Sequence, residues 1–402
     1  MNPEAVGELG AWLRLTLTPG IGSGAARRLL AAFGLPQAIF SAPHAAVRQV
    51  VGAQQAQALQ MVPEGLDALL ESTVTWLAFE AAGSGPMGPI RRRVVTLGDP
   101  GYPASLLQME DPPLLLYTLG VAHLGDVANG AAGLMHDMRS SLAIVGSRNP
   151  SAQGALNARR FAHDLATRGL TIVSGMALGV DAAAHEGALE APAIAGGVPT
   201  IAVVGTGLDR VYPKQHRELA HRIAERGLLV SEYPLGTPPL GHNFPRRNRL
   251  IAGLSCGTLV VEAALQSGSL ITARLALEQG KEVFAIPGSI HAPQSRGCHA
   301  LIRHGAKLVE SAEDVLEELP AIAAAPGADA ARPVEVEAES AVPTPASDPL
   351  IVALGHDPVS LDALQARTGL ETANLQAQLL MLELEGHVAR LPGGLFQRVA
   401  AG

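Results

Sequence analysis

The chain has 402 residues, of which 48% are hydrophobic and 16% are charged, so it can bury the cores of two or three domains and is not disordered as a whole. Two cysteines, Cys256 and Cys298, exclude a disulfide framework, and they lack the paired spacing of a zinc site. The net charge of −8 is uneven: residues 1–85 carry 4 basic and 6 acidic side chains, residues 86–318 carry 21 of each, and residues 319–402 carry 4 and 10.

The first region, residues 1–82, has the apolar spacing of a small all-helical domain. Its start, Met1–Gly10, carries acidic residues and no basic ones. No secretion signal is therefore expected. Because the chain has only two cysteines, a cytoplasmic location is expected. The predicted helices of this region are Ala25–Phe33, Ala45–Met61 and Gly65–Ala82.

A glycine-rich turn, Pro19-Gly20-Ile21-Gly22, separates the first two apolar segments of this region. One interpretation is a helix-hairpin-helix whose loop amides contact a DNA phosphate, with Arg27 and Arg28 beside it. The other is a turn in a small helical interaction module. We favour the second interpretation, because short glycine motifs occur in many structural turns.

The second region, residues 83–319, opens with a linker at 83–86 and then alternates short apolar runs with helical stretches, which is typical of a parallel α/β sheet. Residues 121–141 are rich in glycine and alanine and are interpreted as a surface insertion. The uncharged stretch Ala191–Leu208 is interrupted by proline and glycine, so no membrane span is expected. The predicted strands are Val94–Leu97, Leu114–Tyr117, Leu142–Val145, Leu170–Ser174, Thr200–Val204, Leu228–Ser231, Thr258–Val261 and Val283–Ile286.

Residues 320–347 are rich in alanine, proline and glutamate and are interpreted as a disordered linker. Residues 348–400 then follow the order of a winged helix, with two short strands around Pro392-Gly393-Gly394. The predicted helices are Pro349–Leu354, Ser360–Thr368 and Glu371–Glu385.

A further alternative is a transcription regulator that acts through residues 348–400, but its expected recognition helix, Glu371–Gln378, has no lysine or arginine to hold DNA phosphates. A protein–protein role is favoured over that reading, as is weak DNA contact through Arg390 and Arg398.

Small polar residues follow several of the predicted strands. In an open parallel sheet, ligands bind beyond the carboxyl ends of the strands, where helix N-termini present free amides. Gly146-Ser147-Arg148 follows one strand, with Ser151 as the expected N-cap of the next helix, and Ser174-Gly175 follows another. Ser267-Gly268-Ser269 opens a later helix. These loops are expected to converge on one edge of the sheet.

The segment Phe244-Pro245-Arg246-Arg247-Asn248-Arg249 places three guanidinium groups, an amide and an aromatic ring within six residues. Arginines bind phosphates and phenylalanine stacks on unpaired bases, so the segment predicts a platform for single-stranded nucleic acid. The alternative is a salt-bridged helix start. Arg91-Arg92-Arg93 precedes the first predicted strand and is interpreted as a solvated edge.

Catalytic and cofactor motifs are missing from the sequence. There is no GxxxxGK[ST], GxSxG or HExxH, and Gly205–Arg210 fails the GxGxxG pattern at its last position. Asp181 and His185 share a helix face, and we interpret them as groups that tie a helix end to its neighbour. No enzyme activity, cofactor or metal is expected.

Many separate blocks of the middle region together resemble the DNA-processing protein A family, also called Smf. These blocks are Tyr102-Pro103, Asp111-Pro112-Pro113, Ala143 to Arg148, Val173 to Ala177, Gly179 to His185, Tyr212-Pro213, Ser231 to Pro234, Phe244 to Arg249, Ser267 to Thr272 and Ile286-Pro287-Gly288. The two ends are similar to a sterile-alpha-motif-like domain and to the winged helix of some members.

The resemblance implies a Rossmann-like core and a cytosolic protein, a homodimer through that core, that binds and protects incoming single-stranded DNA and loads the recombinase RecA onto it during natural transformation. The DNA-contacting residues that it implies are Gly146, Ser147, Arg148, Ser174, Gly175, Lys214, Phe244, Arg246, Arg247 and Asn248. Ser267, Gly268 and Ser269 join them through the strand-end pattern.

An enzymatic alternative rests on Cys256–Glu262, which resembles the loop of nucleotide N-glycoside hydrolases on a related Rossmann-like fold, where a glutamate acts at the glycosidic bond. Leu254 and Ser255 replace the paired glycines that would cradle the phosphate. Glu262 is therefore predicted to be a structural carboxylate that pairs with the Arg246–Arg249 cluster.

Overall fold

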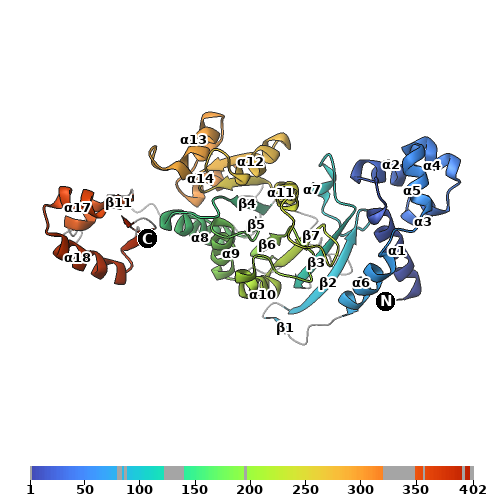
Figure 1. Ribbon diagram of the computed structural model, residues 1–402, viewed down its shortest axis with the longest axis horizontal. Coiled ribbons are helices and arrows are strands. Elements are labelled where there is room, and N and C mark those ends of the chain that lie inside the picture. Colours follow the sequence, from blue (N-terminus) through green and yellow to red (C-terminus); the bar gives the residue numbers. More distant parts are fainter. Residues whose placement is uncertain are drawn as a thin grey trace.

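The computed structural model describes residues 2–78, 84–85, 88–121, 140–193, 197–319, 349–355, 358–391 and 394–398. These residues form an N-terminal group of helices, a central α/β domain and a C-terminal winged helix (Figure 1). No helix in these ranges is long and apolar enough to cross a membrane. Most of the predicted insertion at 121–141 and the whole predicted linker at 320–347 lie outside the described residues.

The N-terminal domain is built around the buried side chains of Trp12, Leu13 and Leu29. The single helix predicted over Ala45–Met61 is wrong, because Gly52, with a φ of +87°, ends one helix and begins the next. The helices are α1 (Pro3–Leu17), α2 (Ser23–Phe33), α3 (Pro36–Ser41), α4 (His44–Val51), α5 (Ala53–Gln60) and α6 (Leu66–Ala78).

This helical domain packs directly on the sheet. The ring of Trp76 in α6 meets that of Tyr117 edge to face, with centroids 5.9 Å apart. Nη1 of Arg92 donates to the main-chain oxygen of Trp76 at 3.2 Å, and its guanidinium lies 5.3 Å from the Trp76 ring centroid. The prediction that Arg91–Arg93 precede the first strand as a solvated edge is therefore wrong, because they lie within that strand and Arg92 packs against an indole.

The described residues of the central domain form a ten-stranded sheet in the order β1-β2-β3-β7-β6-β5-β4-β8-β9-β10. Each predicted strand overlaps an observed one, whereas the two-residue strands β1 and β10 were not predicted. The strands are β1 (Ser84–Gly85), β2 (Gly88–Thr96), β3 (Leu115–Val121), β4 (Ser141–Val145), β5 (Thr171–Ser174), β6 (Thr200–Val203), β7 (Leu228–Ser231), β8 (Gly257–Val260), β9 (Glu282–Ala285) and β10 (Lys307–Leu308).

The strands from β4 to β10 pair in parallel, as predicted. The first two long strands are different: β2 pairs antiparallel with β3, and β3 pairs antiparallel with β7. The connection from β2 to β3 contains only the four-residue helix α7 (Ala104–Leu107), so no long helix returns the chain for a parallel pairing.

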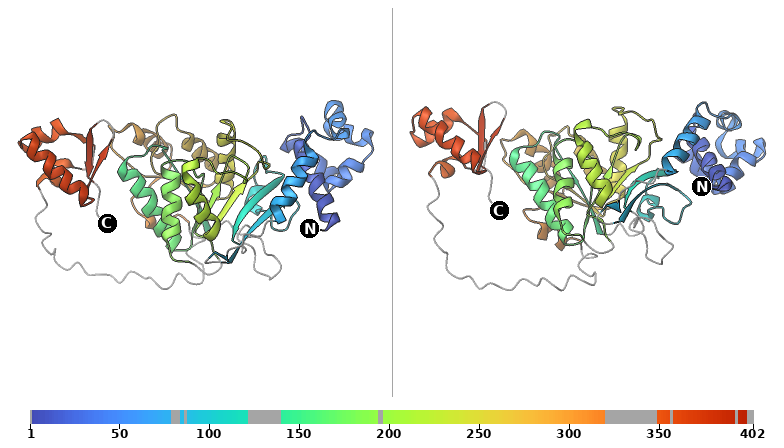
Figure 2. Two further views of the ribbon diagram at one scale, coloured as in Figure 1. Left: turned by 60° about the horizontal axis from the view of Figure 1, so that its bottom comes forward. Right: turned by 90° about the horizontal axis from the view of Figure 1, so that it is seen from below.

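Alternate residues of the central strand β4 face opposite layers of helices. Leu142 and Ile144 pack with α8 (Ala152–Thr167) and α9 (Val180–Glu190), which lie beside α10 (Arg217–Arg226) in Figure 2. Ala143 and Val145 pack on the other side, where the helices are α11 (Asn243–Gly253), α12 (Gly268–Glu278) and α13 (Arg296–Arg303). The strands from β4 to β8 are therefore buried on both faces, as the continuous apolar runs predict.

The order of the parallel strands creates a topological switch point beside β4. From β4 the chain runs to one side through β5, β6 and β7, and later to the other side through β8, β9 and β10. The loops that follow β4 and β8 diverge at this point. Open α/β sheets bind ligands in the crevice that such a divergence leaves.

The C-terminal domain has the predicted winged-helix order, and its three-stranded sheet pairs in the order β11-β13-β12. Leu364, Leu375 and Leu379 lie in its buried core. Its elements are α16 (Pro349–Leu354), β11 (Val359–Ser360), α17 (Leu361–Thr368), α18 (Thr372–Leu384), β12 (Val388–Leu391) and β13 (Leu395–Arg398).

Candidate nucleic-acid interface

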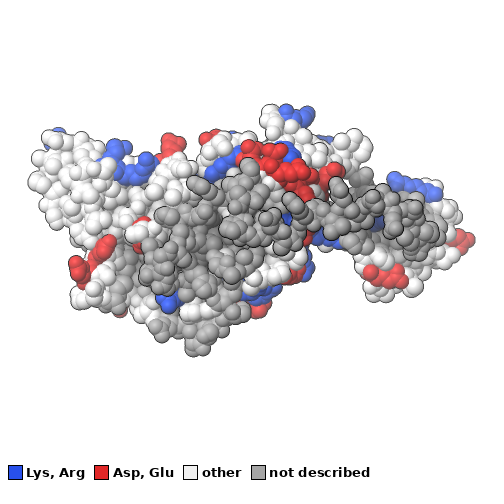
Figure 3. Space-filling view, turned by 180° about the vertical axis from the view of Figure 1, so that it is seen from behind, with Lys and Arg blue, Asp and Glu red and all other residues white. Residues whose placement is uncertain are grey.

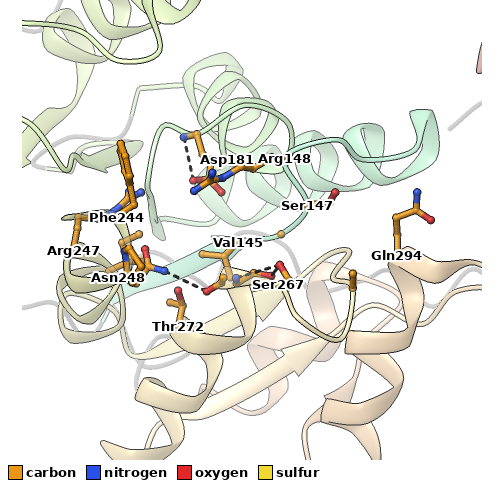
Figure 4. Close-up of a pocket in the computed structure, with 17 residues that line it drawn as sticks. Val145, Ser147, Arg148, Asp181, Phe244, Arg247, Asn248, Ser267, Thr272 and Gln294 are labelled. Carbon is orange, nitrogen blue, oxygen red and sulfur yellow. Dashed lines mark hydrogen bonds between the residues drawn. The ribbon is translucent and has the colours of Figure 1, made fainter. Parts of the chain in front are cut away.

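A pocket of about 410 Å³ lies at the switch point, between the loops after β4 and β8 and the first turns of α11 and α12 (Figure 4). Strand-end loops far apart in the sequence therefore meet at one edge of the sheet, as expected. The predicted site residues that line it are Gly146, Ser147, Arg148, Phe244, Arg247, Asn248, Ser267, Gly268 and Ser269.

The floor of the pocket is the N-terminus of α12. Ser267 is the N-cap of this helix, and its hydroxyl accepts from the main-chain amide of Ser269 at 3.3 Å. The two serine hydroxyls lie 2.6 Å apart, and Nδ2 of Asn248 donates to the main-chain oxygen of Gly268 at 3.3 Å. These bonds fix α11 to the start of α12, where amides and the helix dipole favour an anion.

The aromatic side of the pocket is Phe244, in the first turn of α11. Its ring centroid lies 5.5 Å from that of Tyr212, with a tilt of 33°, and 5.9 Å from the guanidinium carbon of exposed Arg148. A Cβ at Gly205 would come within 3.1 Å of the ring, so the glycine allows this close approach. Tyr212 is 46% exposed, and the sequence does not predict it as a site residue.

The three arginines of the Phe244–Arg249 segment occupy different environments. Arg246 is exposed, whereas Arg247 is 4% exposed and its Nη1 donates to the main-chain oxygen of Val203 at 2.5 Å. Arg249 is buried against the carboxylates of Glu232 and Asp111. The salt-bridge alternative therefore describes Arg249, whereas the platform stays a prediction that exposed Arg246 could serve.

Buried groups behind the pocket hold Arg247 in place. A Cβ at Gly175 would lie 1.8 Å from Nη1 of Arg247, so the guanidinium occupies the space that a side chain would need. Burial lowers the pKa of Arg247 to about 10, which still leaves it protonated at neutral pH. Burial raises the pKa of Asp181, while the charges of Arg247 and Arg148 oppose that shift.

Two side chains join helix α9 to its surroundings, one to the preceding loop and one to the sheet. The carboxylate of Asp181 accepts from the amide of Ala177 at 3.2 Å, and the ring of His185 lies 2.6 Å from the hydroxyl of Thr200 in β6. These contacts confirm that the pair ties the helix to its neighbours. Asp181 also lines the pocket, which the sequence did not indicate.

Four predicted site residues do not line the pocket. The hydroxyl of Ser174 donates to the main-chain oxygen of Ile144 at 2.7 Å, and Gly175 is buried beneath Arg247. Lys214 and Arg246 are exposed outside it. Conversely, Thr272 and Gln294 line the pocket but were not predicted to bind a ligand, because their contribution depends on how α12 and the loop before α13 pack.

Glu262 has a different role from the predicted one. Its carboxylate accepts from the amide and the hydroxyl of Ser151 at 2.9 and 2.5 Å, and Ser151 is the N-cap of α8. A Cβ at Gly154 would clash with this carboxylate. The prediction that Glu262 pairs with the Arg246–Arg249 cluster is therefore wrong, because β8 places it beside the start of α8.

Close to the turn between α1 and α2, the guanidinium of Arg27 in α2 donates to the main-chain oxygen of Glu110, which belongs to the central domain. This contact favours the structural interpretation of that turn. Among the residues that the structure describes, no group of three or more histidine, cysteine, aspartate or glutamate side chains could hold a metal ion.

Comparisons with known proteins agree with this architecture. Residues 93–320 match the family model of DNA recombination-mediator protein A, and residues 330–394 match that of the DprA winged helix domain. Protein Smf of Escherichia coli is 44% identical over 298 residues, which are 73% of this chain and 74% of that protein. DNA processing protein DprA of Streptococcus pneumoniae is 46% identical over 220 residues, which are 55% of this chain and 72% of that protein.

A solved structure gives the same result in three dimensions. The X-ray structure of DNA processing protein A from Streptococcus pneumoniae superposes with a TM-score of 0.60 at 35% sequence identity, covering 76% of this chain and 95% of that chain. The strand-end blocks, the sheet order and the winged helix are all accounted for by one family. The chain belongs to the DNA-processing protein A family, whose members include Smf and DprA.

Proposed function

We propose that this chain binds single-stranded DNA in the pocket at the switch point. The observation that carries the proposal is the arrangement of Phe244 between Tyr212 and Arg148, directly beside the N-terminus of α12. An aromatic face next to cationic and amide groups suits an unpaired base joined to its phosphate. A duplex keeps its bases stacked and cannot offer them to such a surface.

The DNA phosphates would bind to a few local cations, because the surface of the central domain is not positive as a whole. Residues 86–318 have no net charge, and on the face shown in Figure 3 basic and acidic side chains form separate small groups among the residues that are not grey. Arg148, Arg246 and Lys214 are the exposed cations of the predicted site. Buried Arg247 would add field at the pocket wall, while its hydrogen bond to Val203 persists.

The cellular role that we propose is the one implied for the family. A cytoplasmic homodimer, joined through the Rossmann-like domain, would protect incoming single strands during natural transformation and load RecA onto them. The role would need no chemical step. In support, Glu262, the carboxylate on which hydrolysis would depend, is engaged by Ser151 at the start of α8.

The binding part is tested by Phe244→Leu, with Phe33→Leu in the N-terminal domain as the matched control. Loss of one base-stacking contact costs about 1–3 kcal/mol, so Phe244→Leu should weaken binding of fluorescent oligo-dT by about tenfold. Binding of the duplex should not change, and Phe33→Leu should leave both affinities unchanged. Equal affinities of the Phe244→Leu and unmodified chains for oligo-dT would contradict the proposal.

The loading part is tested separately by the rate of RecA filament assembly on a single strand coated with single-strand binding protein. The unmodified chain should accelerate assembly, and Phe244→Leu should do so only at higher concentration. Normal DNA binding without acceleration would refute RecA loading and leave the binding site intact.

A further inference from the structure

The third helix of the winged-helix domain, α18, has two apolar faces. Leu375, Leu379 and Leu382 pack into the core of the domain. On the opposite side, at 3.6 residues per turn, the spacing i, i+4, i+7, i+11 forms a second apolar line that solvent reaches. We call this line the outer stripe of α18, and it consists of Ala373, Ala377, Leu380 and Leu384, with Met381 at its margin.

The outer stripe is unusually exposed for large apolar side chains. Leu380 is 56% exposed, Met381 62% and Leu384 80%. The helix lies along the lower edge of the domain in Figure 1, and none of its residues lines the switch-point pocket. Contiguous exposed apolar side chains mark interaction sites in soluble proteins.

The chemistry of the helix argues against DNA as the partner. Residues 372–384 contain no lysine or arginine, and Glu383 and Glu385 lie at the C-terminal end. A helix that enters the major groove needs basic residues to hold the phosphates. The outer stripe therefore favours an apolar protein surface as its partner.

We propose that the outer stripe pairs with the outer stripe of a second copy of this chain, with the two helices antiparallel. The stripe changes from small to large along the helix, since alanines occupy its first half and leucines its second. Antiparallel pairing around a two-fold axis places Ala373 opposite Leu384 and Ala377 opposite Leu380. Each leucine then fills the space that an alanine leaves, whereas a parallel pair would set leucine against leucine.

The flank of the stripe fits the same arrangement. Glu383 is exposed beside the stripe, and the two-fold brings it level with Asn374 of the second copy. On that flank, Glu383 faces Thr372 and Gln376 of the second copy. Their hydroxyl and amide groups carry no charge, so they do not repel the carboxylate. The C-terminus of each helix also lies beside the N-terminus of the other, which is the favourable orientation of their dipoles.

One helical stripe buries less than the roughly 1,200 Å² of a stable interface, so the pairing is weak on its own. It becomes effective where copies are held close together, as on one DNA strand or within a dimer joined elsewhere. The inference does not depend on DNA binding by the central domain, because it rests only on α18.

Full-length chains with one added cysteine each test whether the partner is a second copy and whether the two helices are antiparallel. Ala373→Cys and Leu384→Cys are made as separate proteins, and each is oxidised mildly alone and in a mixture of the two. In an antiparallel pair these positions face each other, whereas two copies of the same position lie about 16 Å apart at 1.5 Å per residue. Linked dimers should be at least fivefold more abundant in the mixture.

The unmodified chain gives the background from Cys298, which is buried, and Cys256, which is half-buried. A mixture that links no more than either protein alone would overturn the proposal. If each protein alone formed as much linked dimer as the mixture, the proposal would also be overturned, because that result would indicate a parallel pair.

Sedimentation of the full chain supplies a second measurement that needs no cysteine. Leu380→Glu should remove the increase of average mass with concentration that the stripe causes, whereas Ala366→Glu, an exposed position on α17, should preserve it. An unchanged mass profile in Leu380→Glu, with the winged helix still folded by circular dichroism, would also overturn the proposal.

Discussion

Burial separates side chains that look equivalent in the sequence. Arg246 and Arg247 are neighbours of the same type, yet one is exposed while the other is held against Gly175 and Val203. The helix turns by about 100° per residue, so adjacent side chains point to different surroundings. A substitution at either position therefore reports on a different property.

Arg247→Ala should lower the free energy of unfolding by about 3 kcal/mol, because it leaves Asp181 and the oxygen of Val203 without their buried partner. Arg246→Ala should change it by less than about 0.5 kcal/mol, as expected for a surface position. Urea denaturation of both variants measures the difference. Equal stability of the two variants would refute the buried role of Arg247.

His185 should make stability depend on pH. Burial lowers its pKa to about 3, whereas the unfolded value is near 6.5. The unfolded chain therefore takes up a proton below pH 6.5 that the folded chain does not. The contribution of neutral His185 is complete above pH 6.5 and is lost as the pH falls toward 3, by about 2 kcal/mol at pH 5.

The test compares urea denaturation at pH 7.5 and 5.0 for the unmodified chain, His185→Gln and the exposed control His291→Gln. His185→Gln should lose less stability on acidification than the other two proteins, by the same 2 kcal/mol or so. If all three proteins lose the same amount, His185 does not have the pKa that its burial implies.

At the scale of elements, strand ends were predictable and their exact partners were not. The apolar runs placed β4, β5 and β8 and the loops after them, because hydrophobic patterning determines which segments are buried. Glu262 shows the limit of this reasoning: it follows β8 in the sequence, but its partner Ser151 comes from the loop after β4. Only the adjacency of β4 and β8 in the sheet brings them together.

The same limit applies to the β2–β3 pair, to Arg92 and to Tyr212. The sequence predicts strands from local composition, but the direction of pairing and the contact of Arg92 with Trp76 depend on how the helical domain docks. Tyr212 lies 32 positions before Phe244 in the sequence and joins it only in the folded chain.

Glu262→Gln distinguishes the structural role of Glu262 at the N-terminus of α8 from the hydrolase alternative. Replacing the carboxylate that accepts from Ser151 should lower the free energy of unfolding by about 1 kcal/mol, which is typical of a lost helix cap. Affinity for oligo-dT should stay within twofold of the unmodified chain. Loss of a measurable nucleotide hydrolysis in Glu262→Gln, without loss of stability, would favour the enzyme instead.

At the scale of the whole molecule, charge is distributed so that binding must be local. The total of −8 hides a central region with 21 basic and 21 acidic residues, and the C-terminal domain has no basic residue on α18. The N-terminal domain is joined to the sheet through Trp76 and Tyr117 and to the main chain of Glu110 through Arg27. This arrangement gives the start of α2 a structural contact, and it agrees with the proposal that DNA binds at the switch-point pocket.

The measurement that tests this account most directly is the affinity for oligo-dT across a salt series, for the unmodified chain, Arg148→Ala and Arg28→Ala. Each substitution removes one exposed arginine: Arg148 lines the pocket, and Arg28 lies in α2 of the N-terminal domain. Each neutralised phosphate contributes a log–log slope of about −0.7 for single strands, so Arg148→Ala should make the slope shallower by about 0.7. Arg28→Ala should leave it unchanged. A flat salt response, or a slope that changes with Arg28 and not with Arg148, would contradict the account.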